Sequence, residues 1–398
     1  MNRRRVIVLG VVALALGGFG LAQMSAPTSR ASEPALGSVC RQRAGEERRL
    51  CYIRVLTGHL YKYGVADAVA TLDTLAAADP DVATRAHEYA HGIGRLAYSR
   101  APDVAATFVA CGDRAASGCR HGFMQGYLES QKRVTASELR GFCRPLEAAA
   151  FSRALWSQCL HGLGHGLTMF HGHDVPRALV DCEQLETEWE RQSCYGGVFM
   201  ESFVNATASH TMDAGEGGGA HQHGGAFKAV DSTDMLYPCS IMAQRYLYAC
   251  YEMQTTVMLY LNGGDIAAAA RECDRVPLAM RVPCYESLGR DVTTYASQDP
   301  RQAAQLCAKG SEPYRPACYG SAARSLANLT GQTGDALDLC DVVARDRGVG
   351  SNDATTCYRY VGNMIAMLFG TIPERRAACA RISDAVAVAA CRRGAEVL

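Results

Sequence analysis

The stretch that decides the fold reads DIAAAARECDRVPLAMRVPCYESLGR and spans residues 265–290. Its alanine-rich first part, which ends at Cys273, predicts a helix. A short loop with Pro277 and Pro283 follows, and a second helix opens at Cys284. Because the two cysteines stand where the first helix ends and the second begins, the segment predicts a helical hairpin closed by a disulfide, which contributes a few kcal/mol to stability.

The hairpin is one unit of a repeat. The second cysteines of successive units are spaced by 34 residues, at Cys250, Cys284 and Cys318 and again at Cys357 and Cys391. A fixed period of this size is typical of stacked helix pairs. The unit that spans residues 302–320 repeats the plan of helix, proline-containing loop and second helix.

The N-terminal half follows the same plan with looser spacing. Its predicted second helices are Cys51–Tyr63, Arg85–Tyr98, Cys119–Ser130, Ser152–Phe170 and Glu188–Val204. The alternation of apolar and polar residues that is typical of half-buried strands is scarce. With about ten units we expect an all-α fold, a curved solenoid or toroid of disulfide-stapled helical hairpins. This architecture resembles tetratricopeptide-type arrays, but their usual consensus residues are not visible, so the resemblance implies no functional residue.

The cysteines indicate the compartment. All 18 fall into consecutive pairs, and no Cys-x-x-Cys motif is present: 40 with 51, 111 with 119, 143 with 159, 182 with 194, 239 with 250, 273 with 284, 307 with 318, 340 with 357, and 379 with 391. So many thiols would be hazardous in a reducing cytosol, whereas in an exported protein they can form disulfides. We therefore predict bonding between neighbours in an oxidising compartment.

The N-terminus supports export. Residues 1–22 combine three arginines with an apolar run and small residues, the form of a signal peptide. The apolar run is at the short limit for crossing a bilayer, so an uncleaved membrane anchor is the alternative. Residues 23–39 are predicted to be a flexible linker. We expect a periplasmic or extracellular protein.

The balance of charges argues against nucleic acid or an anionic membrane as a partner. The 40 basic side chains balance the 40 acidic ones, so no basic face is indicated for nucleic acid or an anionic membrane.

Residues 205–238 contain Gly-rich and His-containing stretches that interrupt the repeat and predict an insertion loop. The loop separates His-rich repeats, residues 40–204, from Cys-paired repeats, residues 239–398.

The eleven histidines are unevenly distributed. They all lie between His59 and His223, although the repeat continues beyond them. Two positions after the second cysteine stand His121 and His161, and His91 holds this place in a cysteine-free unit. Other units carry different residues there, namely Ile53, Gly196, Glu252, Glu286, Gly320 and Arg359. The fold therefore does not require histidine at this position, which indicates a local purpose.

The spacing of five histidines predicts a metal site. His87 and His91 belong to a His-Glu-x-x-His motif, which resembles that of zinc peptidases, with Glu88 as general base. The third histidine of the extended motif is missing, because Ala97 occupies its place. His161 and His165 repeat the spacing that puts two imidazoles on one helix face. The predicted ligands are His87, His91, His121, His161 and His165.

Several ligand sets and metals are compatible with this pattern. Either His87, His91 and His121 bind one ion, or His121, His161 and His165 do, or a tightly curved site uses all five, with room for two ions. Imidazole suits zinc, copper or iron. A carboxylate from Glu201 or Glu129 would favour non-haem iron.

The alternative interpretation of most other histidines is structural. His59, His171, His173 and His210 are expected to be hydrogen-bonded core residues, and the five could form a buried polar network. Recurrent His-Gly steps could simply let helices approach closely, because glycine has no Cβ. His221 and His223 are either mobile ligands or exposed residues of the insertion.

Three functions follow from these features. The first is an exported metal-dependent enzyme, a hydrolase if the metal is zinc and an oxidase if it is copper or iron. The second is a non-catalytic metal-binding protein, and the third is an extracytoplasmic scaffold that binds a protein or peptide. A tyrosine follows the second cysteine in four C-terminal units and is predicted to pack within the chain: Tyr251, Tyr285, Tyr319 and Tyr358.

Overall fold

The computed structural model describes residues 33–112, 117–131, 133–147, 152–208, 227–330 and 333–396. Within these ranges all regular structure is helical, and no strand occurs. The first half contains α1 (Glu33–Arg41), α2 (Gly45–Tyr63), α3 (Val65–Ala78), α4 (Pro80–Thr84), α5 (Ala86–Arg100), α6 (Val104–Cys111), α7 (Gly118–Glu129), α8 (Ala136–Phe142), α9 (Arg153–Phe170), α10 (Val175–Cys182) and α11 (Glu188–Ala208).

The second half continues in the same way. It contains α12 (Leu247–Tyr251), α13 (Thr255–Leu261), α14 (Ile266–Arg275), α15 (Arg281–Tyr295), α16 (Pro300–Cys307), α17 (Arg315–Thr330), α18 (Gly334–Arg347), α19 (Asn352–Leu368), α20 (Ile372–Cys379) and α21 (Ala385–Ala395). The five second helices predicted in the N-terminal half correspond to α2, α5, α7, α9 and α11.

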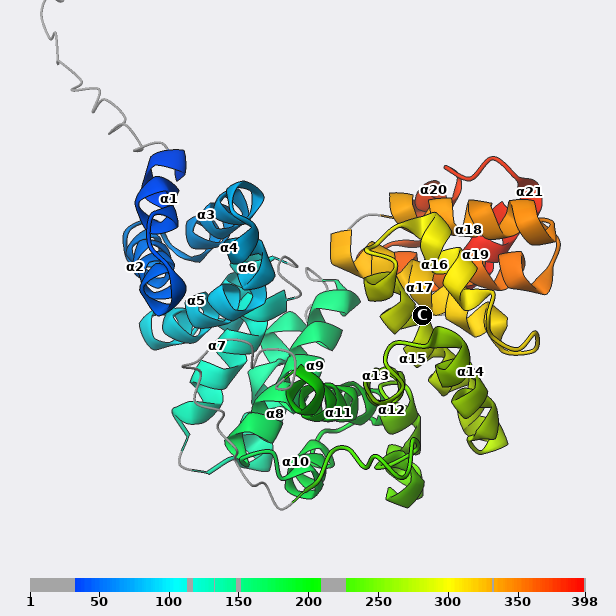
Figure 1. Cartoon of the computed structure of the whole chain (residues 1–398), viewed down its shortest axis with the longest axis horizontal. Helices are drawn as coiled ribbons and strands as arrows, with labels where there is room; N and C mark the ends of the chain where they lie inside the picture. The colour runs from blue at the N-terminus through cyan, green and yellow to red at the C-terminus, as the bar shows by residue number, and fades with distance from the viewer. Residues whose placement is uncertain are drawn as a thin grey trace, which may run out of the picture.

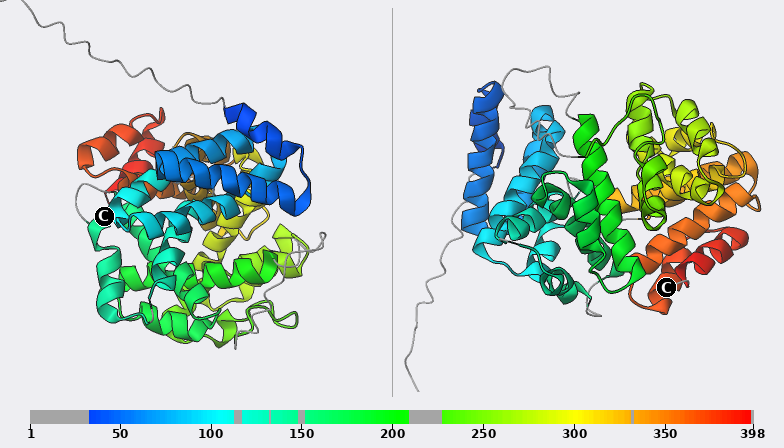
Figure 2. Two further views of the ribbon diagram at one scale, coloured as in Figure 1. Left: turned by 90° about the vertical axis from the view of Figure 1, so that its left-hand side faces the viewer. Right: turned by 90° about the horizontal axis from the view of Figure 1, so that it is seen from below.

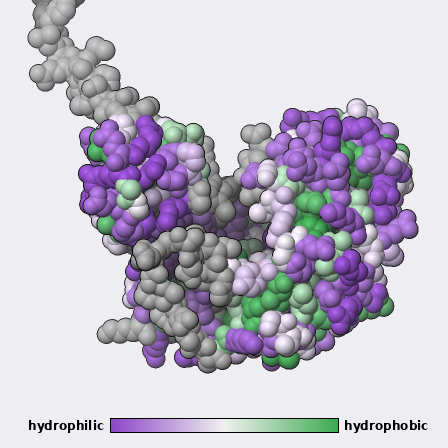
Figure 3. Space-filling model, viewed as in Figure 1, coloured by the Kyte–Doolittle hydropathy of each residue, from purple (hydrophilic) through white to green (hydrophobic). Residues whose placement is uncertain are grey.

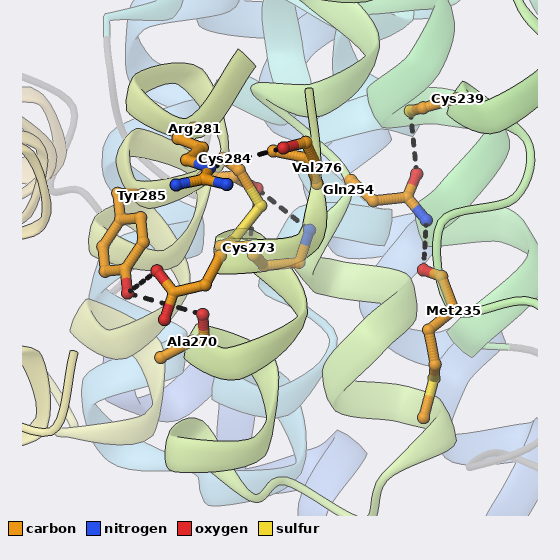
Figure 4. The surroundings of a disulfide bond; sticks show 12 residues. Met235, Cys239, Gln254, Ala270, Cys273, Val276, Arg281, Cys284 and Tyr285 are labelled. Carbon is orange, nitrogen blue, oxygen red and sulfur yellow. Dashed lines mark hydrogen bonds between the residues drawn. A yellow bond between two sulfur atoms is a disulfide. The ribbon is translucent and has the colours of Figure 1, made fainter. Parts of the chain in front are cut away.

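Nine disulfides close the hairpins, and each joins neighbours in the sequence, which confirms the predicted pairing. In the unit of α14 and α15, Cys273 near the end of the first helix bonds Cys284 near the start of the second (Figure 4). Beside this bond, the Tyr285 hydroxyl donates to Asp274 Oδ1 at 3.0 Å. Covalent and polar links thus fix the turn between the two helices. The pairing fits an oxidising extracellular environment.

The second helices of the hairpins pack side by side. Each helix contacts the next one in the series α2, α5, α7, α9, α11, α12, α15, α17, α19 and α21. The helices follow an arc in Figure 1, and Figure 2 shows it from two further sides. Helix α9 also contacts α19, so the arc brings an early hairpin against a late one. This packing is consistent with a repeat solenoid.

Glycine allows neighbouring second helices to touch. A Cβ added at Gly122 of α7 would lie 1.8 Å from the carbonyl oxygen of His91 in α5. A Cβ added at Gly164 of α9 would lie 2.0 Å from the carbonyl oxygen of Cys194 in α11. The predicted close approach at a His-Gly step is therefore real at Gly122, whereas a Cβ at Gly92 would meet nothing within 4 Å.

The tyrosines that follow the second cysteines belong to the hydrophobic core. Tyr251, Tyr285, Tyr319 and Tyr358 are each at most 2 % exposed. Their predicted role in packing is confirmed. Since each sits one residue after a disulfide, the repeat places the same buried ring at the base of each of these hairpins.

The ends of two predicted segments differ from the helices observed. Helix α1 already includes Glu33, inside the predicted linker, and α11 extends to Ala208, inside the predicted insertion at 205–238. The predicted signal, residues 1–22, lies outside the described residues. Among the described helices, none has both the length and the apolar character to span a membrane. On the face drawn in Figure 3, the molecule is hollowed between the N-terminal and C-terminal arms of the arc.

Candidate metal centre

Three consecutive second helices carry the predicted ligands. His87 and His91 lie on α5, His121 lies on α7, and His161 and His165 lie on α9. Helix α7 contacts both α5 and α9. The backbone contact at Gly122 holds α5 and α7 close together. The histidine side chains of the two helices therefore lie next to each other.

The five imidazoles form a continuous line of ring contacts, and we call them the histidine cluster. Ring centroids are 6.1 Å apart for His87 and His91 and 5.6 Å apart for His87 and His121. His121 stacks on His165 at 4.4 Å with an interplanar angle of 19°, and His165 lies 4.9 Å from His161. Residues up to 78 positions apart in sequence, from His87 to His165, are therefore linked through neighbouring rings.

His165 has one nitrogen bonded and one without a partner. Its side chain is buried, and its Nδ1 lies 2.9 Å from Glu201 Oε2. Its Nε2 is buried with no hydrogen-bond partner. Burial alone would raise the pKa of the Glu201 carboxyl, but the hydrogen bond from His165 outweighs this effect and the pKa lies below its ordinary value. Glu201 is therefore a carboxylate that accepts a hydrogen bond from the Nδ1–H of His165, which leaves the buried Nε2 of His165 with a free lone pair.

Burial keeps three rings of the cluster neutral at physiological pH. It lowers the pKa of His91 to about 4 and that of His161 to about 3, and it holds the pKa of His121 well below the ordinary value. Mutual repulsion among the cationic forms acts in the same direction. Neutral imidazole is the form that binds metals, because a lone pair must be available.

The two other predicted polar participants lie in ion pairs. Glu88 contacts Arg49 at 2.8 Å and Arg85 at 3.1 Å, and its side chain is 43 % exposed. Glu129 contacts Arg95 at 2.7 Å. Glu201, in contrast, hydrogen-bonds His165 of the histidine cluster. The role of Glu88 as general base stays a prediction.

The histidines outside the cluster divide into two kinds. His59 Nδ1 lies 3.0 Å from Asp67 Oδ1, and His171 Nε2 lies 2.6 Å from Asp181 Oδ2, so both are hydrogen-bonded structural residues, as expected. His173 differs, because its Nδ1 is buried without a hydrogen-bond partner. His210, His221 and His223 lie outside the described residues.

The position that carries histidine in the early units carries acid in two later ones. Glu252 Oε1 lies 3.2 Å from Arg324 Nη2, and Tyr360 donates a hydrogen bond to Glu286. Burial raises the pKa of Glu252, and the charge of Arg324 opposes this. Glu252 thus pairs with Arg324 and Glu286 with Tyr360, whereas Nε2 of His165 has no hydrogen-bond partner.

The sequence did not predict that Met200 and His173 lie near this site. Met200 Sδ lies 3.4 Å from His161 Nε2, and His173 is close enough to Glu201 to help lower the pKa of that carboxyl. Met200 and His165 both stand six residues after a second cysteine, so the repeat register could have placed Met200 beside the histidines. His173 could not be found this way, because it lies in a turn with a positive φ of 64°.

No group of three His, Cys, Asp or Glu side chains in the described ranges is arranged to hold a metal ion as it stands. His121 and His165 stack face to face, an arrangement in which their lone pairs do not converge. No family model, curated protein or solved structure matches this chain. Its function must therefore be inferred from the residues of the site.

Proposed function

We propose that this chain is an exported metalloprotein whose ion is bound by the histidine cluster. The observation that carries the proposal is His165, whose Nδ1 bonds Glu201 while its Nε2 is buried without a partner. In metal-binding histidines the ring nitrogen that does not bind the metal almost always donates a hydrogen bond to a carboxylate or a carbonyl. This bond fixes the tautomer and the ring orientation. A buried polar atom without a partner is also costly, at about 1–3 kcal/mol, and a bound ion would remove this cost.

The proposal includes a rearrangement of the stacked rings. Side-chain rotation about χ1 and χ2 would separate His121 from His165 and direct their lone pairs to one point, with His87 or His91 completing the site. The ion would be zinc, copper or iron, the metals that imidazole suits. Glu201 would act from behind His165 as the group that orients it.

The curved arrangement belongs to the same proposal. We take the chain to be a curved solenoid or toroid of helical hairpins, similar in plan to tetratricopeptide arrays, with the site on its row of second helices. The contact between α9 and α19 supports this curvature. A site between adjacent second helices is favoured because packed helices lie about 8–10 Å apart, within reach of two imidazoles.

Elemental analysis tests the proposal. The protein would be purified without a His tag, dialysed against a chelator, and reloaded separately with zinc, copper and iron. We expect stoichiometric binding of at least one of these metals in the wild type. His165→Ala and His121→Ala should lose the ion, while His59→Ala and His171→Ala should keep it, because those rings already bond carboxylates.

Two results would overturn the proposal. One is the lack of stoichiometric metal in the folded wild type under all three loadings, which would leave a helical scaffold. The other is equal metal content in the wild type and the His165→Ala variant at an unchanged melting temperature.

Catalysis by the bound ion is the enzymatic form of the proposal. An ion held by three imidazoles keeps a position open for water or oxygen, as hydrolysis or oxidation requires. The zinc-loaded protein would be assayed with ester and peptide substrates, and the copper- or iron-loaded protein for oxygen consumption. Turnover that His165→Ala abolishes supports an enzyme, and a loss of turnover with retained metal in Glu88→Gln assigns the base. Metal binding without turnover indicates a carrier.

A further inference from the structure

The end of the histidine cluster formed by His161 contains a sulfur atom. His161 Nε2 on α9 lies 3.4 Å from Met200 Sδ on α11. Both side chains are partly buried between two helices that touch at Gly164. Gly196 faces His161, and a Cβ there would lie 3.4 Å from His161 Nδ1, so the ring fills the space that a side chain would otherwise occupy.

The contact with sulfur brings a ring nitrogen to a thioether, and its character depends on which ring nitrogen carries the proton. A neutral imidazole carries one ring proton. Nδ1 is the ring nitrogen on the side of α11 that holds Gly196, whereas Nε2 faces Met200. With the ring proton on Nδ1, Nε2 and Sδ face each other as two acceptors, which a bound cation would join.

The separation of the two atoms fits one shared ion. A metal at about 2.0 Å from nitrogen and about 2.3 Å from sulfur, with a tetrahedral angle between them, places the two atoms about 3.5 Å apart. The observed 3.4 Å needs almost no movement. His165, one helical turn after His161, supplies a buried Nε2 without a partner for the same ion.

Charge and softness select the ion. A thioether is a soft ligand that favours copper(I) over zinc or iron(II). The positive charge of Arg290 acts on His161. Because Coulomb repulsion is proportional to the charge of the ion, a monovalent ion is disfavoured by Arg290 half as much as a divalent one.

We infer that this site binds copper(I), with His161 Nε2, His165 Nε2 and Met200 Sδ as its ligands. The inference rests on the proposed function that the histidine cluster binds an ion. It places that ion at the His161 end of the cluster, where His161 and Met200 join His165 in place of His121 and His87 or His91. It goes beyond that function in assigning the oxidation state and the thioether.

Competition titrations of the full, disulfide-intact protein test this inference. Copper(I) would be kept reduced with ascorbate under nitrogen and titrated against a chromophoric copper(I) chelator, and zinc(II) against a chromophoric zinc chelator. Met200→Leu keeps the volume and removes the sulfur. Met253→Leu is the matched control, because the sulfur of Met253 already contacts Arg290.

The expected result is a loss of copper(I) affinity of at least about tenfold in Met200→Leu, corresponding to about 1.4 kcal/mol. The zinc affinity and melting temperature of this variant should be unchanged, and Met253→Leu should bind copper(I) like the wild type. X-ray absorption should show a sulfur neighbour of copper at about 2.3 Å in the wild type and none in Met200→Leu.

The outcomes separate the two proposals. If Met200→Leu binds copper(I) as tightly as the wild type while His165→Ala does not, the thioether site is wrong and the metalloprotein proposal stands. If the wild type does not bind copper(I), the copper(I) site is wrong, and if it also binds neither zinc nor iron, both proposals are wrong.

Discussion

Gly122 lies at the contact between α5 and α7, where a methyl group has no space. An added Cβ would lie 1.8 Å from the His91 carbonyl oxygen, which belongs to a helix backbone and cannot rotate away. We expect Gly122→Ala to lower the free energy of unfolding by at least about 1–3 kcal/mol, the usual cost of overpacking. Thermal unfolding followed by circular dichroism measures this effect.

Gly92→Ala is the matched control one helix away. Nothing lies within 4 Å of the added Cβ, so the substitution should leave stability unchanged or raise it by up to about 1 kcal/mol through helix propensity. Equal melting temperatures for the two variants would contradict the close contact between α5 and α7.

Asp79 is a buried carboxylate that gives stability a defined pH dependence. Burial opposes its ionisation, but hydrogen bonds from Arg48 at 2.7–2.8 Å and from the Tyr52 hydroxyl outweigh this and lower its pKa below the ordinary 3.8. A lowered carboxyl pKa stabilises the fold above the unfolded-state pKa, and this contribution is lost as the pH falls through the folded-state value.

Asp79→Asn should therefore be about 1.5–3 kcal/mol less stable than the wild type at pH 7, the range for hydrogen bonds to charged groups. The difference should shrink below pH 4, as measured by urea unfolding at several pH values. Asp338→Asn, at an exposed position, provides the comparison. A difference between Asp79→Asn and wild type that stays constant from pH 7 to pH 3 would contradict the proposed role of the charge.

At the scale of the element, an aspartate caps the start of several first helices. Asp299 Oδ1 accepts a hydrogen bond from the backbone of Gln302 at 2.7 Å, and Pro300 occupies the first turn of α16. Asp103, Asp174 and Asp265 cap α6, α10 and α14 in the same way. Each cap satisfies a backbone N–H that the helix leaves without a partner.

Asp299→Ala should lower the free energy of unfolding by about 1 kcal/mol, because the cap is lost. Asp299→Ser keeps an acceptor at the same place and should remain within a few tenths of a kcal/mol of the wild type. Chemical denaturation of the three proteins compares them. If serine and alanine are equally destabilising, the hydrogen bond to Gln302 does not stabilise α16.

The helices themselves followed closely from sequence. The predicted second helix at Arg85–Tyr98 is α5 at Ala86–Arg100, and the one at Ser152–Phe170 is α9 at Arg153–Phe170. Such boundaries depend on caps, prolines and cysteines within a few residues of the chain. Helix α11 extends beyond its predicted end at Val204 to at least Ala208, because the residues after Val204 carry no helix breaker until the glycines.

At the scale of the whole molecule, stability depends on the disulfides. Their loops span 8–17 residues, and the chain-entropy relation gives about 2.5–3 kcal/mol for each. Nine such bonds together contribute about 25 kcal/mol, more than the ~5–15 kcal/mol net stability of a typical protein. We therefore expect the fold to depend on an oxidising environment.

Reduced and alkylated protein should accordingly be unfolded at 25 °C. Far-ultraviolet circular dichroism should show the loss of most helix, and mass spectrometry should count 18 modified cysteines. The oxidised protein carried through the same treatment without reductant should keep its helix content. A cooperative thermal transition in the fully reduced chain would show that helix packing alone supports the fold.

The sequence by itself determined the helical hairpins and the pairing of all cysteines, because both depend on residues at most 17 positions apart. It also singled out the five histidines from their repeat position. Only the tertiary structure decided their neighbours: His121 stacks on His165, and His165 bonds Glu201 from a different hairpin. It also turned Glu88 toward Arg49. The reason is that the relative register of two helices is set where their backbones touch, as at Gly122, and a period of 34 residues does not specify that contact.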